Sequence, residues 1–216
     1  MIQYILWDFN GTLVDDVSAC LQNMNNLLKK YRKPLIDLTT YRDVFTFPVI
    51  EYYKRVGIID TNEAFATVAH EWMAGYYAME KDLKVFDDTL DNLKRVRHMG
   101  LSQGVLSASS TAQLKRLLDR FELTPYMDHI LGLEDIYAKG KVEIGLDFIQ
   151  NHQLSPNQMV LIGDTLHDYQ VASQMGIHCI LFSGGHQSDE ILGQAGCRVV
   201  KRITDIFDQQ LIAQIT

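Results

Sequence analysis

Short apolar runs separated by helical patterns recur along most of this chain. The runs cover residues 2–9, 101–106, 130–132, 159–162 and 178–182, and glycine or polar residues follow most of them. This pattern is typical of strands that are buried on both faces. Helical spacing of apolar residues predicts helices over 112–121, 142–150 and 169–175. The alternation predicts a parallel sheet between helices, which is a three-layer, Rossmann-like α/β core.

Residues 15–84 break this alternation. Their apolar residues form two helical stripes with no comparable strand-like run between them: Leu21, Met24, Leu27 and Leu28, then Phe65, Val68, Ala69, Trp72, Met73 and Tyr76. These helices could cover one face of the sheet, but their number at a single crossover favours an inserted domain. We therefore expect a helical cap domain over 15–84 and a core built from 1–14 and 85–216.

Composition limits the classes of partner. The 216 residues are 47% hydrophobic and 22% charged, and the net charge is -7, which argues against a nucleic-acid-binding surface. No apolar stretch approaches the roughly 20 residues that cross a bilayer, and the N-terminus lacks the basic region of a signal peptide. We expect a cytoplasmic protein without a membrane partner. The three cysteines are scattered and predict neither a zinc site nor a disulfide framework.

Carboxylates stand where two of the predicted strands end. Asp8 closes the first apolar run, and Asp164 closes the fourth, with Asp168 four residues further on. Ligands bind beyond the carboxyl ends of the strands in open α/β sheets. Burying such acids without a partner costs several kcal/mol. If the strands are neighbours, three carboxylates converge, and hard oxygen ligands of this kind suit Mg²⁺.

Four motifs in order resemble those of the haloacid dehalogenase superfamily. Asp8-Phe9-Asn10-Gly11-Thr12 is similar to its first motif, Asp-x-Asp-x-Thr, and Gly163-Asp164 with Asp168 to its fourth. Ser107 holds the place of the second-motif hydroxyl. Lys141 or Lys139 supplies the third-motif lysine, and Lys141 is favoured because it opens a predicted helix. The motifs span nearly the whole chain, and the helical insertion resembles the cap of phosphoglycolate-phosphatase-like members.

The resemblance implies a role for each motif residue. Asp8 would attack phosphorus and form an aspartyl-phosphate. Mg²⁺ would be held by Asp8, the backbone carbonyl of Asn10, Asp164 and, directly or through water, Asp168. Ser107 and Lys141 would hold the phosphoryl oxygens. Gly11, Thr12, Ser107 and Ala108 would bind or shape the substrate's phosphate site, and many relatives carry a polar residue where this chain has Ala108.

Asn10 departs from the family pattern. The acid usually found there protonates the leaving alcohol and later activates water, and an amide can do neither. Three explanations stay open. The substrate is an acyl or aryl phosphate whose leaving group needs little protonation, the acid comes from the cap or the substrate, or the protein is a weak phosphatase that mainly binds a phosphorylated ligand.

Several other polar or aromatic residues have a structural and a functional interpretation. A stretch of the cap could face the cleft, although each residue singly is more often cap core or surface: Arg42, Thr46, Phe47, Pro48, Tyr52, Tyr53 and Lys54. We expect His167 to orient its loop or face solvent, and His186 to lie in a surface loop rather than at the cleft. Asp15 and Asp16 are expected to cap the first inserted helix rather than to bind metal.

The function predicted by the resemblance is a Mg²⁺-dependent phosphatase acting on a small, phosphoglycolate-like phosphomonoester. The alternative is a weakly active or inactive phospho-ligand-binding protein, and a phosphomutase or dehalogenase within the superfamily stays possible. A P-loop and a dinucleotide-binding motif are absent, and a receiver domain would place its acidic pair first. We expect a monomer or weak homodimer.

Overall fold

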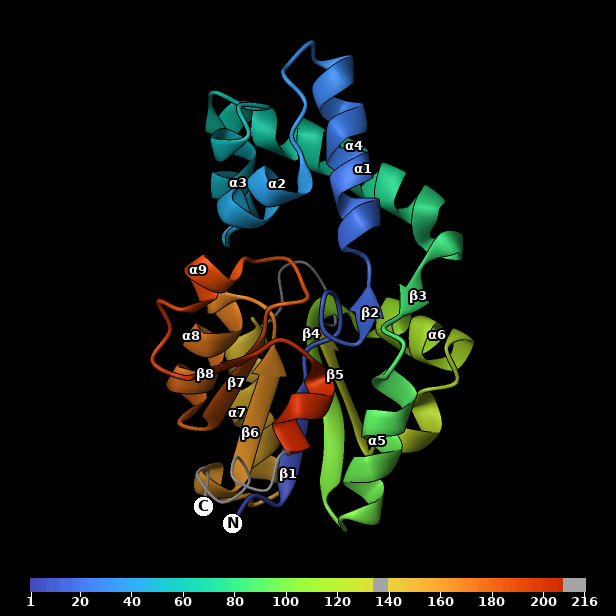
Figure 1. Cartoon of the computed structure of the whole chain (residues 1–216), viewed down its shortest axis with the longest axis vertical. Helices are drawn as coiled ribbons and strands as arrows, with labels where there is room; N and C mark the ends of the chain where they lie inside the picture. Colours follow the sequence, from blue (N-terminus) through green and yellow to red (C-terminus); the bar gives the residue numbers. More distant parts are fainter. Residues whose placement is uncertain (134–139, 208–216) are drawn as a thin grey trace.

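The computed structural model describes residues 1–133 and 140–207, and their strands form a parallel sheet (Figure 1). Its order is β5-β4-β1-β6-β7-β8. The strands are β1 (Tyr4–Trp7), β4 (Ser102–Ser110), β5 (His129–Leu133), β6 (Met159–Gly163), β7 (His178–Phe182) and β8 (Arg198–Val200). Central strand β1 pairs in parallel with β4 on one side and β6 on the other. The predicted α/β core with a parallel sheet is therefore confirmed.

Helices cover both faces of this sheet because its central strand is apolar on both. Ile5 and Trp7 of β1 belong to the hydrophobic cluster that includes α5 (Thr89–His98) and α6 (Thr111–Arg120). Tyr4 and Leu6 point the other way, into the cluster of α7 (Lys141–Asn151) and α8 (Leu166–Met175). The alternation of side chains along a strand thus builds the three layers.

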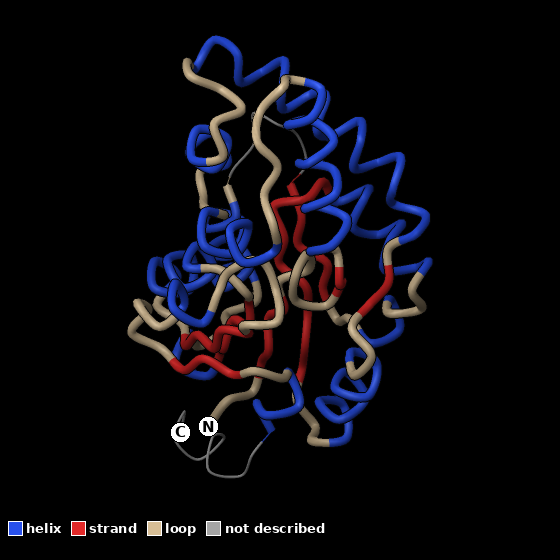
Figure 2. The backbone as a smooth tube through the Cα atoms, turned by 45° about the horizontal axis from the view of Figure 1, so that its top comes forward, coloured by secondary structure: helices blue, strands red, loops and turns tan. Residues whose placement is uncertain are grey.

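A group of helices beyond the carboxyl ends of the strands forms the cap (Figures 1 and 2). It comprises α1 (Val17–Lys30), α2 (Leu38–Val44), α3 (Val49–Arg55) and α4 (Phe65–Met79). The antiparallel strands β2 (Val14–Asp15) and β3 (Lys84–Val85) carry the chain into the cap and back. Helices α1 and α4 pack closely. A Cβ at Gly75 would lie only 2.0 Å from the side-chain oxygen of Asn23, so a glycine is needed at this contact.

Several elements were not predicted or differ in extent. Strand β4 continues to Ser110 instead of ending at Leu106, with an irregular register against β5 between these residues. Strands β2, β3 and β8 and helix α9 (Asp189–Leu192) have two to four residues each, too few for a periodicity to be recognised. Short 3₁₀ helices span Asn62–Ala64, Glu80–Asp82, Thr124–Tyr126, Pro156–Gln158 and Ile203–Phe207.

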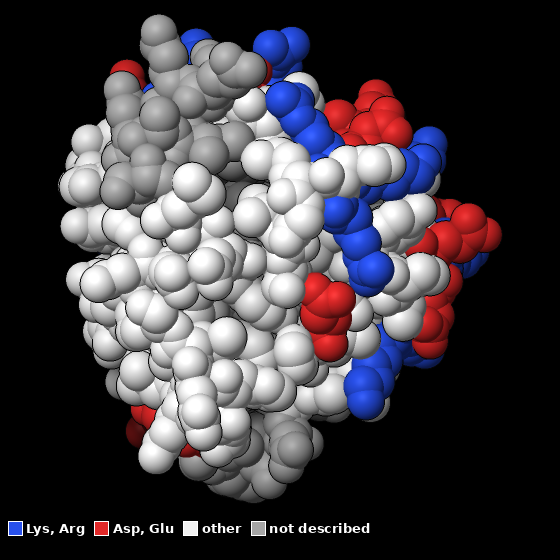
Figure 3. Space-filling view, turned by 90° about the horizontal axis from the view of Figure 1, so that it is seen from below, with Lys and Arg blue, Asp and Glu red and all other residues white. Residues whose placement is uncertain are grey.

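Charged side chains of both signs are interspersed on the face seen from the end opposite the cap (Figure 3). The blue and red residues gather toward one side of this view and alternate there. Within residues 1–133 and 140–207, no helix is long and apolar enough to cross a membrane.

Candidate active site

The predicted site residues lie close together at the point in the sheet where the strand order reverses. The chain moves outward from β1 through β4 to β5, then returns to the opposite side of β1 with β6. Such a switch point leaves a crevice at the carboxyl ends of the strands. Asp8 follows β1, Asp164 follows β6, and the backbone N–H of Asp8 donates to the carbonyl of Ile162 across 2.8 Å. Parallel pairing therefore brings the first and fourth motifs together.

Lys141 joins two of the carboxylates. Its Nζ lies 2.5 Å from Oδ1 of Asp8 and 2.6 Å from Oδ1 of Asp168, and its side chain is buried. Burial opposes the charge of Lys141, but the attraction of Asp168 and Asp8 outweighs it and raises the pKa of the ammonium. Burial would likewise raise the pKa of Asp168, yet Lys141 and Thr165 hold that pKa below its usual range. The contacts with Asp8 and Asp168 are compatible with Lys141 as the motif-three lysine, which stays a prediction, and Lys139 lies outside the described residues.

Asp168 is positioned by the start of α8. It is the third residue of the helix and forms a capping box with Thr165, whose hydroxyl donates to Asp168 Oδ2 across 2.7 Å. A Cβ at Gly163 would lie 2.3 Å from the Asp168 carboxyl carbon. The glycine of the fourth motif is thus needed for the close approach of the strand end to this carboxylate.

Three carboxylates could hold a metal ion. Oxygen atoms of Asp8, Asp164 and Asp168 all lie within 4.8 Å of one another. Burial, followed by the repulsion of nearby acids, raises the pKa of Asp8 to about 8 despite Lys141. Burial also raises the pKa of Asp164 to about 6. Lys141 is one cation beside three carboxylates, and their hard oxygen donors fit a divalent cation such as Mg²⁺.

The loop after β1 supports Asp164. The Thr12 hydroxyl donates to Asp164 Oδ1 across 3.1 Å, and the backbone N–H of His186 donates to Oδ2 across 2.6 Å. Gly11 has a φ of 73°, and a Cβ there would lie 2.3 Å from Asp164 Oδ2. Gly11 and Thr12 are buried and hold the carboxylate in place. Their predicted contact with substrate stays a prediction.

Strand β4 contributes Ser107 and Ala108 to the cavity wall. Ser107 is buried, and its Oγ accepts a hydrogen bond from the backbone N–H of Ser109 across 3.1 Å. The hydroxyl proton of Ser107 thus stays available for an acceptor. Ala108 is exposed and lies where the register of β4 against β5 is irregular.

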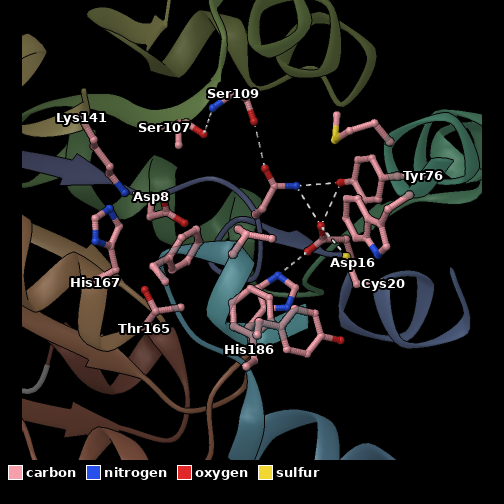
Figure 4. Close-up of a pocket in the computed structure, with 18 of the residues that line it drawn as sticks. Asp8, Asp16, Cys20, Tyr76, Ser107, Ser109, Lys141, Thr165, His167 and His186 are labelled. Atoms are coloured by element: carbon pink, nitrogen blue, oxygen red, sulfur yellow. Dashed lines mark hydrogen bonds and ion pairs between the residues drawn. The ribbon is translucent and has the colours of Figure 1, made fainter. Parts of the chain in front are cut away.

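Asn10 is held by a polar network that the sequence did not reveal (Figure 4). Its Nδ2 donates to Asp16 Oδ2 across 2.8 Å and to the Tyr76 hydroxyl across 2.7 Å, while its Oδ1 accepts from the Ser109 hydroxyl across 3.2 Å. Tyr76 in turn donates to Asp16 across 2.8 Å. The amide is thus tied to the core and to the cap at once.

The expectation that Asp16 caps the first inserted helix with its side chain is wrong. It occupies the N-cap position of α1 but makes no capping hydrogen bond with its side chain. Its buried carboxylate instead accepts from the Gly11 backbone N–H across 2.9 Å and from Asn10 and Tyr76. Burial opposes ionisation, but His186 and the hydrogen bonds from Asn10 and Tyr76 hold the pKa of Asp16 below its ordinary value.

His186 corrects another expectation, because it is buried at the cavity rather than lying in a surface loop. Its Nε2 lies 3.2 Å from Asp16 Oδ1, and its Nδ1 lies 2.8 Å from the Tyr41 hydroxyl. Burial would lower the pKa of His186, but Asp16 outweighs it and raises the pKa to about 9. His186 is therefore a buried cation that joins core and cap. The sequence gives no local signal for the pair of Asp16 and His186, because 170 residues separate them.

Cap residues and His167 form the other walls of a cavity of about 520 Å³. The ring of His167 packs against Phe47 in a tilted arrangement, with 4.8 Å between ring centroids, and both line the cavity. Phe47 is 37% exposed and is not cap core, whereas Tyr52 and Tyr53 are buried and also line the cavity. Arg42 is not a free surface residue, because its guanidinium donates to the carbonyls of Gly184 and Gly185.

Comparisons with known proteins bear on the family and the fold. A family model described as haloacid dehalogenase-like hydrolase matches residues 5–182. A probable phosphatase, IndB, from Dickeya dadantii is 24% identical over 196 residues, covering 87% of this chain and 84% of that protein. A phosphoglycolate phosphatase from Pseudomonas syringae pv. syringae is 24% identical over 189 residues, covering 84% of this chain and 70% of that protein. A haloacid dehalogenase-like family hydrolase from Streptococcus pneumoniae shares the fold, with a TM-score of 0.82 at 20% identity, covering 100% of this chain and 99% of that chain.

Proposed function

This chain belongs to the haloacid dehalogenase-like hydrolase family, and we propose that it is a Mg²⁺-dependent phosphatase that forms an aspartyl-phosphate on Asp8. The predicted superfamily and hydrolase class are thereby confirmed. The observation that carries the proposal is the convergence of Asp8, Lys141, Asp164 and Asp168 at the switch point of the sheet. The substrate is proposed to be a small phosphorylated metabolite, and phosphoglycolate-like esters are the first candidates from relatives of that name.

The chain's own residues would bind and position the phosphoryl group. Lys141 would offset the repulsion between the Asp8 carboxylate and an anionic substrate. The free hydroxyl proton of Ser107 would donate to a phosphoryl oxygen. Asp8, Asp164, Asp168 and the Asn10 carbonyl would hold Mg²⁺, which supplies positive charge to the carboxylates and the phosphoryl oxygens when bound.

Nucleophilic attack by Asp8 requires its ionised form. Burial raises the pKa of Asp8 and so opposes ionisation, while the ammonium of Lys141 favours it. A divalent cation beside the carboxylate would favour the ionised form. The cap would close the cavity against bulk water. The domain division at residues 14 and 84, a cytoplasmic location and a monomer or weak homodimer stay predictions.

The test is release of inorganic phosphate from 4-nitrophenyl phosphate with and without MgCl₂. Asp8→Asn is expected to remove turnover by a factor of about 10⁴ or more, as loss of a nucleophile does. Asp15→Asn is the matched control, because Asp15 is exposed and does not line the cavity. Turnover that survives Asp8→Asn or is indifferent to Mg²⁺ contradicts the proposal. Binding of phosphate without any turnover would favour the alternative phospho-ligand-binding protein.

A further inference from the structure

The cap side of the cavity is built for an apolar ligand. Phosphate and its metal would occupy the end near Asp8, while the remaining wall is mainly aromatic or apolar: Phe47, Tyr52, Phe65, Trp72, Met73 and Tyr77. The cavity, about 520 Å³, lies in the size range of pockets that enclose drug-sized ligands. A two-carbon organic group would leave much of this wall uncovered.

The described part of the wall offers little to bind a second negative charge. Lys141 is the sole lysine or arginine among the described lining residues, and Asp8 and Asp168 already bind it. His186 is paired with Asp16. His167 packs its ring against Phe47 and so adds to the aromatic wall. A carboxylate on the organic part of the substrate would be desolvated here without a matching cation, which is costly.

The leaving-group oxygen must also depart without receiving a proton from residue 10. Each polar atom of the Asn10 side chain is already hydrogen-bonded, and an amide has no acidic proton to give. An alkoxide is about as basic as hydroxide, whose conjugate acid, water, has a pKa of about 15.7. A phenol has a pKa of about 10. A phenolate thus leaves unprotonated far more easily than an alkoxide.

The wall and Asn10 point to the same chemistry by independent routes. We propose that the substrate is the phosphate monoester of a phenol, with its ring against the aromatic wall of the cap. This inference rests on the proposed phosphatase function and replaces phosphoglycolate-like esters as the substrate class.

The proposed hydrolysis of the aryl phosphate would proceed in two steps. An oxygen of Asp8 forms a bond to phosphorus while the bond from phosphorus to the phenolic oxygen breaks. The electron pair leaves on the phenolate, which takes its proton from water. Water then attacks phosphorus and gives a proton to the solvent, which replaces the proton that the phenolate took. The bond to Asp8 breaks, and inorganic phosphate and the Asp8 carboxylate are released.

The first test compares phenyl phosphate with benzyl phosphate in the presence of MgCl₂. Both carry the same ring, but only phenyl phosphate has a phenolate leaving group. We expect kcat/KM for benzyl phosphate to be lower by about 10²–10⁴, the usual contribution of general acid catalysis. Across ring-substituted phenyl phosphates, kcat/KM is expected to fall steeply as the pKa of the phenol rises. 2-Phosphoglycolate is expected to be a poor substrate.

The second test separates ring binding from phosphate binding. Met73→Ser is expected to lower kcat/KM for phenyl phosphate by about tenfold through lost apolar contact, and to leave the inhibition constant of inorganic phosphate unchanged. Met99→Ser is the matched control, because Met99 is 39% exposed, close to the 37% of Met73, but does not line the cavity.

The outcomes distinguish the inference from the function on which it rests. Equal kcat/KM for benzyl and phenyl phosphate, a preference for 2-phosphoglycolate, or a Met73→Ser variant that behaves like Met99→Ser overturns the aryl phosphate assignment but leaves a phosphatase. Absence of Mg²⁺-dependent turnover with every ester overturns both.

Discussion

The side-chain amide of Asn10 donates a hydrogen bond to the buried carboxylate of Asp16 across 2.8 Å. Asn10, which departs from the family pattern, is thus hydrogen-bonded to a residue six positions further along the chain. An aspartate at position 10 would face Asp16 within hydrogen-bond distance. Two carboxylates so close cannot both ionise without strong repulsion. The polar network therefore gives a structural reason for asparagine at this position.

Asn10→Asp is expected to lower the free energy of unfolding at pH 7 by about 1–3 kcal/mol, because it removes a buried hydrogen bond and adds a like charge. Repulsion raises the pKa of the new pair in the folded state. The loss should therefore be small near pH 4 and grow as pH rises. Urea unfolding between pH 4 and 8 measures it. Asn26→Asp, at an exposed position of α1, is the control, and equal behaviour of the two variants contradicts this interpretation.

The same substitution has a kinetic consequence. A protonated carboxyl at position 10 can donate to a departing alkoxide, so Asn10→Asp is expected to raise kcat/KM for benzyl phosphate by at least about tenfold. The rate with 4-nitrophenyl phosphate should change little, because its leaving group needs no proton. An unchanged rate with benzyl phosphate would show that Asn10 does not limit the chemistry.

Asn10 also leaves the second step without a base at position 10. Hydrolysis of the aspartyl-phosphate is therefore expected to be slower than its formation from an aryl phosphate. Rapid mixing with 4-nitrophenyl phosphate should give a burst of nitrophenolate equal to the concentration of active protein. Acid quenching should trap labelled phosphate on the chain, and not on Asp8→Asn. A linear time course without a burst places the slow step at or before phosphoryl transfer.

Much of the fold and part of the site could be predicted from local patterns. Asp8, Asp164 and Lys141 each stand at the end of a strand or the start of a helix, and the parallel order brings them together. Short apolar runs sufficed to find the five longest strands of the sheet, whereas β8, with three residues that begin at Arg198, was missed.

The polar network around Asp16 could not be predicted in this way. The N-cap interpretation of Asp16 followed from its position before a helix, but tertiary partners on the cap and on the loop after β7 compete for its carboxylate. Tyr76 lies 60 residues away and looked like part of an apolar helical stripe. Contacts between distant segments leave no periodicity, so a single sequence carries no signal for them.

Lys141→Met tests the charge balance of the site. Removing the cation leaves Asp8 and Asp168 as buried acids without their partner, which typically costs 3–5 kcal/mol. We expect a loss of stability of about that size in urea unfolding without metal, and partial recovery with MgCl₂. Lys115→Met, at an exposed position of α6, is the control. A variant as stable as this control would mean that the two carboxylates are not ionised together.

Glu80 and Arg116 tie the end of the cap to α6. The guanidinium contacts both carboxylate oxygens, at 2.7 and 2.9 Å, and Glu80 is buried whereas Arg116 is largely exposed. Because one partner is solvated, Arg116→Met is expected to cost about 1–2 kcal/mol, between the values for surface and buried pairs. A double-mutant cycle with Glu80→Gln measures the coupling. Additive effects of the two substitutions would contradict a direct interaction.

The buried pair of His186 and Asp16 predicts a loss of stability at alkaline pH. The pKa of His186 is raised in the folded state to about 9 from 6.5. Its stabilisation is therefore fully present below pH 6.5 and is lost as pH rises through about 9, a change of roughly 3 kcal/mol. The raised pKa of Asp8 acts in the same direction over part of this window. Urea unfolding from pH 6 to 9.5 should therefore be compared between wild type and His186→Gln. The variant is expected to be less stable at pH 6 and to lose less stability as pH rises, and parallel curves would show that His186 is not protonated in the folded protein.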